Sequence, residues 1–171
     1  DKAGRALAFV VDDLSMSFAG VDAARRALEK FVKDEMRPGD LIAILRTSRG
    51  VGALQLFSSD KLELLAAIKS IRWGMHYGRL SQIMALSYSI RALQDIPGRK
   101  YLVLMSSHTT LNGSLVPDPT KSISRSADFS AYNLLADAAL RAGVVIHTTN
   151  ATGLLAPFSG GPWATVDISS L

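Results

Sequence analysis

The sequence contains no cysteine, which excludes disulfide bonds, thiolate metal sites, structural zinc sites and cysteine nucleophiles. It also lacks a run of about 20 uncharged apolar residues, the length that a membrane-spanning helix needs, so we expect no membrane insertion by this domain. The charged start Asp1-Lys2-Ala3-Gly4-Arg5 has no signal-peptide pattern. Lysine and arginine are spread along the chain and form no basic run, so we expect no nucleic-acid partner.

The composition that is present is that of a globular domain. Of the 171 residues, 48% are hydrophobic and 20% are charged, and the net charge is +4. Such a chain has enough apolar residues to bury one core. We therefore expect a single domain over 1–171, in which the weak pattern after about residue 153 predicts a shortened or atypical final element.

Hydrophobic runs alternate with amphipathic stretches along the chain. They predict strands at 6–12, 41–46, 51–58, 100–105, 144–148 and 163–168, helices at 20–36, 61–72, 80–93 and 127–142, and a long loop at 107–125. Parallel strands need helical crossovers, whereas the short turn before 51–58 suits an antiparallel hairpin. The predicted fold class is therefore α/β, a doubly wound, mostly parallel sheet with one antiparallel hairpin strand and helices on both faces.

Apolar spacing also predicts which side of two helices is buried. In the helix at 20–36 the stripe is Ala24, Leu28, Phe31 and Val32, with the basic side chains of Arg25, Arg26, Lys30 and Lys33 outside. In the helix at 61–72, which Ser59 or Asp60 can cap, the residues expected to face inward are Leu62, Leu65, Ala66 and Ile68.

Three oxygen-bearing side chains follow the first predicted strand in the pattern Asp13-x-Ser15-x-Ser17. Alternate residues leaving a strand end can point short side chains into one crevice, and Mg2+ prefers oxygen ligands. Ligands of open α/β sheets usually bind at the carboxyl ends of the strands. The position and the chemistry both predict a divalent-cation site.

The same motif resembles the first segment of the metal-ion-dependent adhesion site of von Willebrand factor type A domains. The segments 46–60, 71–73 and Pro97-Gly98-Arg99-Lys100 resemble the VWFA-related subgroup described from acidobacterial proteins, and the likeness runs from about residue 6 to about residue 155. It implies a Rossmann-like fold whose rim holds Mg2+ or Mn2+ on Asp13, Ser15 and Ser17. It also implies that a carboxylate of a partner protein takes the open coordination position.

Two loops depart from the pattern of the family. Where a threonine is expected in the second loop the chain offers Ser81, and where an aspartate is expected in the third loop it reads Ser106-Ser107-His108. The candidate ligands are therefore Asp13, Ser15, Ser17, Ser81 and Ser107. Asp12 is expected to face the other side of the strand. In the alternative, a degenerate site, Asp13 accepts hydrogen bonds from Ser15, Ser17 or backbone amides at a helix start.

Catalytic interpretations find less support in the residues. A haloacid dehalogenase-like phosphohydrolase would need a second carboxylate two residues after Asp13, where Ser15 stands. No nucleophile-elbow glycine pattern surrounds any serine, and the segment 13–20 has one glycine, too few for a phosphate cradle. We therefore expect that the chain is not an enzyme.

The function predicted is a protein-binding or adhesion-type module that uses the loops after the parallel strands. Aromatic and arginine side chains anchor many interfaces, so the expected partner contacts are Trp73, His76, Tyr77, Arg79 and His108. The alternative is a structural domain of a larger protein that binds no metal. By the family resemblance, the expected location is extracytoplasmic or secreted.

Overall fold

A parallel four-stranded sheet forms the centre of the protein. The computed structural model describes residues 4–49, 57–73, 82–107 and 122–150; for residues 49 and 122–129 it describes the backbone alone. The strands are β1 (Arg5–Val11), β2 (Leu41–Arg46), β3 (Arg99–Ser106) and β4 (Val144–Asn150). The helices are α1 (Phe18–Lys30), α2 (Lys61–Lys69), α3 (Gln82–Gln94) and α4 (Ser122–Ala142). A π-helical turn, η1 (Phe31–Glu35), continues α1, and a 3-10 turn, η2 (Thr47–Arg49), follows β2.

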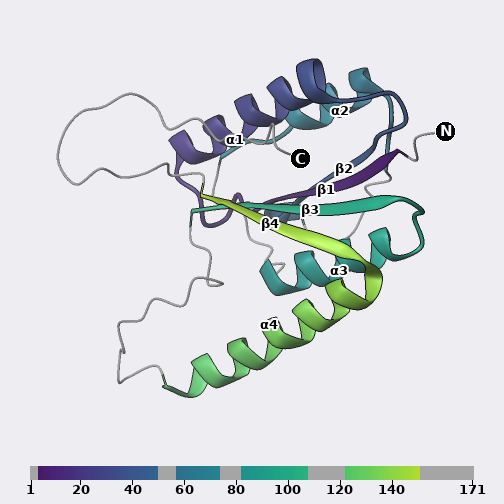
Figure 1. The fold of residues 1–171 in the computed structure, drawn as a ribbon. Helices are drawn as coiled ribbons and strands as arrows, with labels where there is room; N and C mark the ends of the chain where they lie inside the picture. The colour runs from purple at the N-terminus through teal and green to yellow at the C-terminus, as the bar shows by residue number, and fades with distance from the viewer. Residues whose placement is uncertain (1–3, 50–56, 74–81, 108–121, 151–171) are drawn as a thin grey trace.

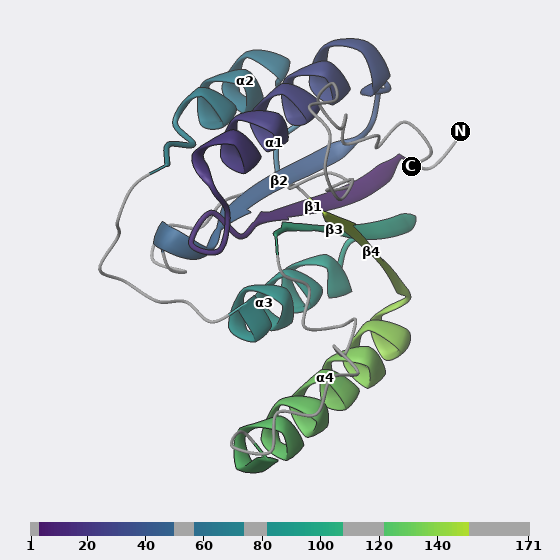
Figure 2. The same cartoon turned by 90° about the vertical axis from the view of Figure 1, so that its left-hand side faces the viewer.

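The strands lie in the order β2-β1-β3-β4, and all neighbouring pairs of these described strands are parallel. Helices α1 and α2 cover one face of the sheet, and α3 and α4 lie on the other (Figure 1, Figure 2). The predicted α/β, doubly wound parallel arrangement is therefore confirmed for this part of the chain.

The alternation of side chains along β1 explains why both faces are covered. Leu7, Phe9 and Val11 belong to the cluster with α1 and α2, whereas Ala6, Ala8 and Val10 belong to the cluster with α3 and α4. All six are buried, as expected for a central strand that meets helices on both sides. Small residues on the second face let α3 approach the sheet closely.

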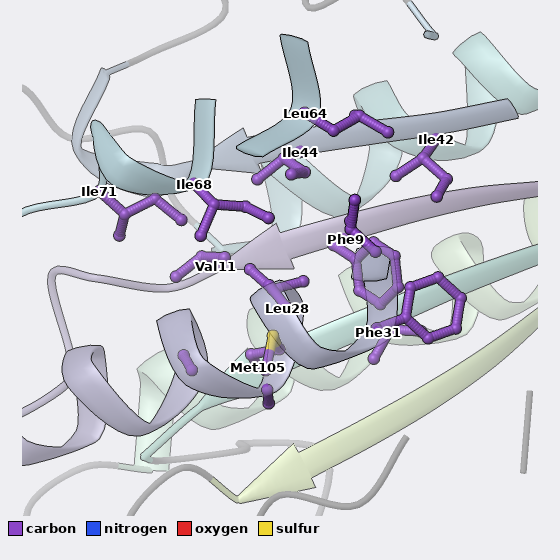
Figure 3. Close-up of a cluster of buried hydrophobic side chains, with 14 of the residues drawn as sticks. Phe9, Val11, Leu28, Phe31, Ile42, Ile44, Leu64, Ile68, Ile71 and Met105 are labelled. Atoms are coloured by element: carbon purple, nitrogen blue, oxygen red, sulfur yellow. The ribbon is translucent and has the colours of Figure 1, made fainter. Parts of the chain in front are cut away.

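Aromatic and branched side chains fill the core under α1 and α2 (Figure 3). The rings of Phe9 and Phe31 meet edge to face with their centroids 5.2 Å apart, and Leu28 is fully buried beside them. The predicted stripe of the first helix is confirmed, because each of its four members is buried.

The predicted inward side of α2 is confirmed at Ile68 and, partly buried, at Leu65, but it is wrong at Leu62 and Ala66. Leu64 and Ile68 are its buried residues, whereas Leu62 is 77% exposed and Ala66 is also exposed. The helix begins as expected, with the Asp60 side chain accepting a hydrogen bond from the Leu62 amide at 2.8 Å.

Three other expectations concern segments that the structure describes only in part or not at all. The hairpin strand at 51–58 lies mostly outside them, although Ser58 forms an isolated antiparallel bridge with Ile42 through two 2.9 Å backbone hydrogen bonds. The expected loop at 107–125 is too long by a few residues, because α4 begins at Ser122. The edge strand expected at 163–168 lies outside the described residues.

The parallel register brings the carboxyl ends of the strands to one edge. Val11 of β1 pairs with Arg46 of β2 and with Met105 of β3, and Ser106 pairs with Asn150 of β4. We call this edge, with the residues that follow each strand, the rim. Among the helices described, none is both long enough and apolar enough to cross a bilayer.

Candidate functional site

Asp12 and Asp13 leave β1 at the centre of the rim. The backbone amide of Asp12 donates to the Met105 carbonyl at 2.9 Å, so the pairing with β3 continues one residue beyond the strand. The two carboxylates then diverge, and they share the Thr47 hydroxyl but otherwise bind different groups.

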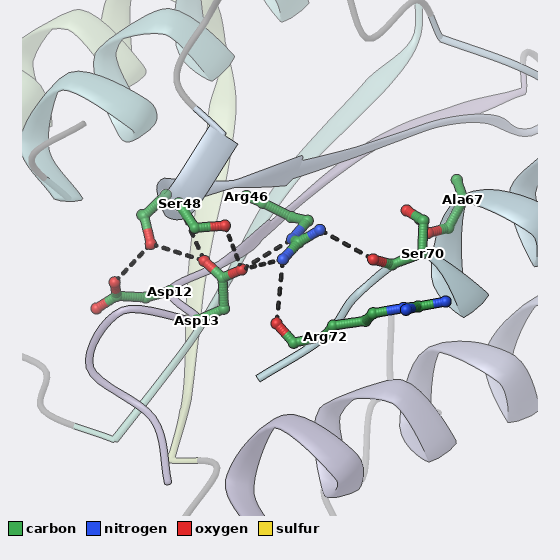
Figure 4. Close-up of polar contacts among 8 residues, drawn as sticks. Asp12, Asp13, Arg46, Ser48, Ala67, Ser70 and Arg72 are labelled. Carbon is green, nitrogen blue, oxygen red and sulfur yellow. Dashed lines mark hydrogen bonds and ion pairs between the residues drawn. The ribbon is translucent and has the colours of Figure 1, made fainter. Parts of the chain in front are cut away.

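The Asp13 carboxylate is buried and fully engaged by the end of β2 (Figure 4). Its Oδ2 accepts from Arg46 Nε at 2.8 Å and from Ser48 Oγ at 2.6 Å, and it lies 2.7 Å from Arg46 Nη2 in an ion pair. Its Oδ1 accepts from the Ser48 amide at 2.9 Å and from Thr47 Oγ1 at 3.2 Å. The side chains of Asp13 and Arg46 are 0% and 4% exposed, so both charges are compensated out of water.

Arg46 also ties this pair to the segment after α2. Its Nη1 donates to the Ser70 carbonyl at 3.0 Å and its Nη2 to the Arg72 carbonyl at 3.2 Å. One buried ion pair thus joins β1, β2 and the turn that leads to Trp73 (Figure 4). Asp13 is therefore a structural anchor. As in the alternative of a degenerate site, its carboxylate accepts hydrogen bonds, but the donors are Arg46, Thr47 and Ser48 instead of Ser15 and Ser17.

The Asp12 carboxylate faces a second set of hydrogen-bond donors. Its Oδ2 accepts from Ser106 Oγ at 2.9 Å and from Gln82 Nε2 at 3.0 Å, and its Oδ1 accepts from Thr47 Oγ1 at 2.9 Å. The Ser15 hydroxyl lies 3.0 Å from Ser106 Oγ and 3.1 Å from the Asp12 carbonyl. We call Asp12, Ser15, Thr47, Gln82 and Ser106 the Asp12 cluster.

Helix α4 supports this cluster from outside, because Tyr132 Oη donates to Gln82 Oε1 at 3.1 Å. Gln82 is the first residue of α3, so the cluster joins the ends of β1, β2 and β3 to two helices on the same face. Sequence reasoning assigned no ligand role to Asp12, Thr47, Gln82 or Ser106, although Ser106 directly follows the strand predicted at 100–105.

The structure separates the candidate ligands predicted from the sequence. Ser15 belongs to the Asp12 cluster, whereas Ser17 caps α1 by accepting a 3.1 Å hydrogen bond from the Gly20 amide. Ser81, His76, Tyr77, Arg79 and His108 lie outside the described residues. The carboxylate that lies with Ser106 and Ser15 is that of Asp12, whereas Asp13 binds the hydroxyls that follow β2.

The donor set of the cluster suits a hard cation. Two buried side-chain polar atoms in the described part of the chain have no hydrogen-bond partner, and one of them is Ser107 Oγ, next to Ser106. Serine hydroxyls and one carboxylate are ligands that Mg2+ and Mn2+ accept. The described residues contain no group of three or more histidine, cysteine, aspartate or glutamate side chains, so the anionic charge available is small.

An aromatic pair stands on the surface beside the anchor. Trp73 is 54% exposed and Phe18 is 68% exposed, and their rings meet edge to face with centroids 6.3 Å apart. Exposed aromatic side chains in contact are typical of binding surfaces. Of the predicted partner contacts, Trp73 is the one that the described residues include.

Comparison with known proteins supports the fold. No protein-family model and no curated protein matches this sequence. The crystal structure of an aerotolerance-related membrane protein from Bacteroides fragilis, determined with multiple mutations to serines, is similar with a TM-score of 0.56 at 13% identity. The match covers 85% of this chain and 66% of that protein, so the likeness extends over most of the α/β sheet and its helices.

Proposed function

We propose that this chain is a protein-binding module of the von Willebrand factor type A kind, and that its rim contacts the partner. The observation that carries the proposal is the Asp12 cluster, in which the ends of three parallel strands bring one carboxylate and several hydroxyls together. Open α/β sheets bind ligands at this edge. The exposed pair Phe18 and Trp73 adds apolar contact area close to it.

Asp12, Ser15, Ser106 and Ser107 would hold a divalent cation, Mg2+ or Mn2+, at the rim. When bound, the cation offers a positive charge to which a partner's carboxylate can coordinate. The residues of this chain supply one formal negative charge, and cation affinity rises with the number of charged ligands. The site is therefore weak alone and strengthened by a carboxylate from the partner.

A binding role suits these residues better than an enzymatic one. The carboxylate of Asp13, which a phosphohydrolase of the haloacid dehalogenase type would use as its nucleophile, is buried, accepts four hydrogen bonds and forms an ion pair with Arg46. A nucleophile needs an open approach for its substrate. The extracytoplasmic or secreted location belongs to the same proposal, and the similar protein from Bacteroides fragilis is named as a membrane protein.

A second candidate is a structural domain that positions its neighbours in a larger protein. The observation in its favour is that Asp12 and Asp13 already have hydrogen-bond partners for all four carboxylate oxygens. A rim that is satisfied internally needs no ligand to be stable.

Calorimetric titration of Mg2+, Mn2+ and Ca2+ into metal-stripped protein distinguishes the two candidates. We expect saturable binding with a dissociation constant of about 1 mM in the wild type, and none in Asp12→Asn. Ser17→Ala is the matched control, because it removes a hydroxyl from the same loop. Loss of the cap should lower the free energy of unfolding by about 1 kcal/mol and leave cation binding unchanged.

Absence of binding in the wild type at concentrations well above millimolar, both with and without added acetate, would contradict the cation site. Capture of a partner protein by the immobilised domain then tests binding itself. If Asp12→Asn abolishes capture at unchanged stability, the rim is a binding surface; if Asp12→Asn only lowers stability, the structural domain is favoured.

A further inference from the structure

A small groove lies between the beginning of α1 and the segment that follows α2. Phe18 and Val21 line it from α1, and Ile71 and Trp73 line it from the other side, around a volume of about 250 Å3. Two arginines, Arg25 and Arg72, complete its wall. We call it the Phe18–Trp73 groove.

The two arginines of the groove are without acidic partners in the described part of the chain. The ion pairs found there are Arg5–Asp40, Arg26–Asp22, Lys33–Glu29 and Arg46–Asp13. Asp22, which also lines the groove, is therefore held by Arg26. Arg25 Nε is moreover one of the two buried side-chain atoms without a hydrogen-bond partner. The groove thus has unpaired positive charge and an unused donor.

The surroundings hold the groove in place without a ligand. Arg46 fixes the Ser70 and Arg72 carbonyls, and the Ser17 cap fixes the first turn of α1, from which Phe18 projects. Figure 4 shows the Arg72 side chain pointing away from the Asp13 carboxylate, so its charge is not used by the anchor. A site formed in advance loses less conformational entropy on binding.

The size and lining of the groove indicate the kind of ligand. Sites for whole small molecules usually enclose about 300–1,000 Å3, so a groove of this volume suits one large side chain of a longer ligand. Exposed aromatic rings prefer apolar anchors, and arginine guanidinium groups prefer carboxylates, which they bind in a bidentate manner.

We infer that the Phe18–Trp73 groove binds an acidic peptide segment of the partner protein, with one aromatic or large aliphatic side chain against Phe18 and Trp73 and an adjacent carboxylate on Arg25 and Arg72. This rests on the proposed function and names the chemistry of the partner. The net charge of +4 favours encounter with an acidic segment.

A nucleic acid would use similar groups but a different arrangement. Single strands stack their bases on open aromatic faces along a groove whose positive charges follow the backbone. Here the two rings are nearly perpendicular, at 85°, and the groove holds two arginines. This geometry suits a side chain entering an apolar recess.

The test uses short blocked peptides with a central phenylalanine flanked by aspartates, and NMR titration of the labelled protein. We expect shifts of the Trp73 indole and the Phe18 amide, and roughly tenfold weaker binding for Arg25→Gln and for Arg72→Gln, since each removes a charge-assisted contact. Lys30→Gln is the matched control, because Lys30 is an exposed cation of the same helix that does not line the groove, and this variant should bind as the wild type does.

Peptides with asparagine in place of aspartate, or serine in place of phenylalanine, should bind at least tenfold more weakly. Equal binding of these peptides, equal loss in Lys30→Gln, or absence of any shift at Trp73 would overturn the inference. Tighter Arg25-dependent binding of a single-stranded oligonucleotide would also overturn it. If the peptide instead shifts residues of the Asp12 cluster and loses affinity in Asp12→Asn, this inference fails while the proposed function stands. If neither surface responds to peptide or cation, both fail.

Discussion

Asp12 and Asp13 show how two adjacent carboxylates acquire separate roles. Asp13 is held by a guanidinium, two hydroxyls and a backbone amide in a buried site, whereas Asp12 faces the hydroxyls of the rim. A buried charge with its partner removed is costly, because neither water nor another cation replaces the lost contacts. Asp13 is therefore expected to contribute mainly to stability, whereas Asp12, which is also buried, is the residue to which the proposed function assigns recognition.

Replacing Arg46 with methionine should reveal the structural role of Asp13. We expect the free energy of unfolding to fall by about 3–5 kcal/mol, because the Asp13 carboxylate stays buried without its counter-ion. Urea denaturation measures the change. Arg26→Met, which breaks an exposed pair on α1, should cost less than about 1 kcal/mol. Similar losses in the two variants would show that the Arg46–Asp13 pair is not the anchor described.

Elements of this fold are joined at both ends of the sheet by ion pairs between residues far apart in sequence. At the end opposite the rim, Arg5 of β1 binds Asp40, the residue before β2, with Nε 3.0 Å from Oδ1. Burial alone would raise the pKa of Asp40. The hydrogen bonds from the Arg5 side chain and from the Arg37 and Arg5 amides, with the charge of Arg5, outweigh burial and hold that pKa below the ordinary value of 3.8.

This pair predicts a pH-dependent part of the stability. The folded pKa of Asp40 is lowered, so its contribution is fully present above about pH 3.8 and is lost as the pH falls through the folded value. We expect Asp40→Asn to be less stable than the wild type at neutral pH, with a difference that shrinks in acid. Urea unfolding at a series of pH values checks this. Asp22→Asn, at an exposed site on α1, should show little difference, and a gap for Asp40→Asn that widens in acid would contradict the assignment.

In helix α2, contacts with neighbouring elements determine which side is buried. Its sequence offers apolar residues on more than one side, so spacing alone found Ile68 but did not select Leu64 over Leu62 and Ala66. The contacts with β2 and α1 in the first core cluster decide which side faces inward. Helix α1 has one clear stripe, and there the sequence prediction and the structure agree.

The whole molecule is a layered sheet in which strands differ in the number of their neighbours. Strands β1 and β3 pair on both sides, whereas β2 and β4 each have one partner among the described strands. Every residue of β1 is buried, but Val145 of β4 is 51% exposed. Unequal pairing and burial predict unequal local stability.

Native-state hydrogen exchange should resolve this gradient. We expect the amides of β1 and β3 to exchange most slowly, close to the limit set by global unfolding, and those of β4 to exchange faster through local opening. The described helices provide an internal reference. Protection of β4 equal to that of β1 would contradict the prediction and would indicate that another segment pairs along the outer edge of β4.

The sequence by itself determined the α/β class, the position of the strand at 41–46 and the buried stripe of the first helix. These features follow from the spacing of apolar residues along the chain, because that spacing differs between a strand and a helix and shows which side of a helix is buried. Only the tertiary structure decided which of the two adjacent carboxylates pairs with an arginine and which contacts Ser106 and Gln82. That choice depends on Arg46, 33 residues away from Asp13, and a contact between distant residues leaves no periodic signal in the chain.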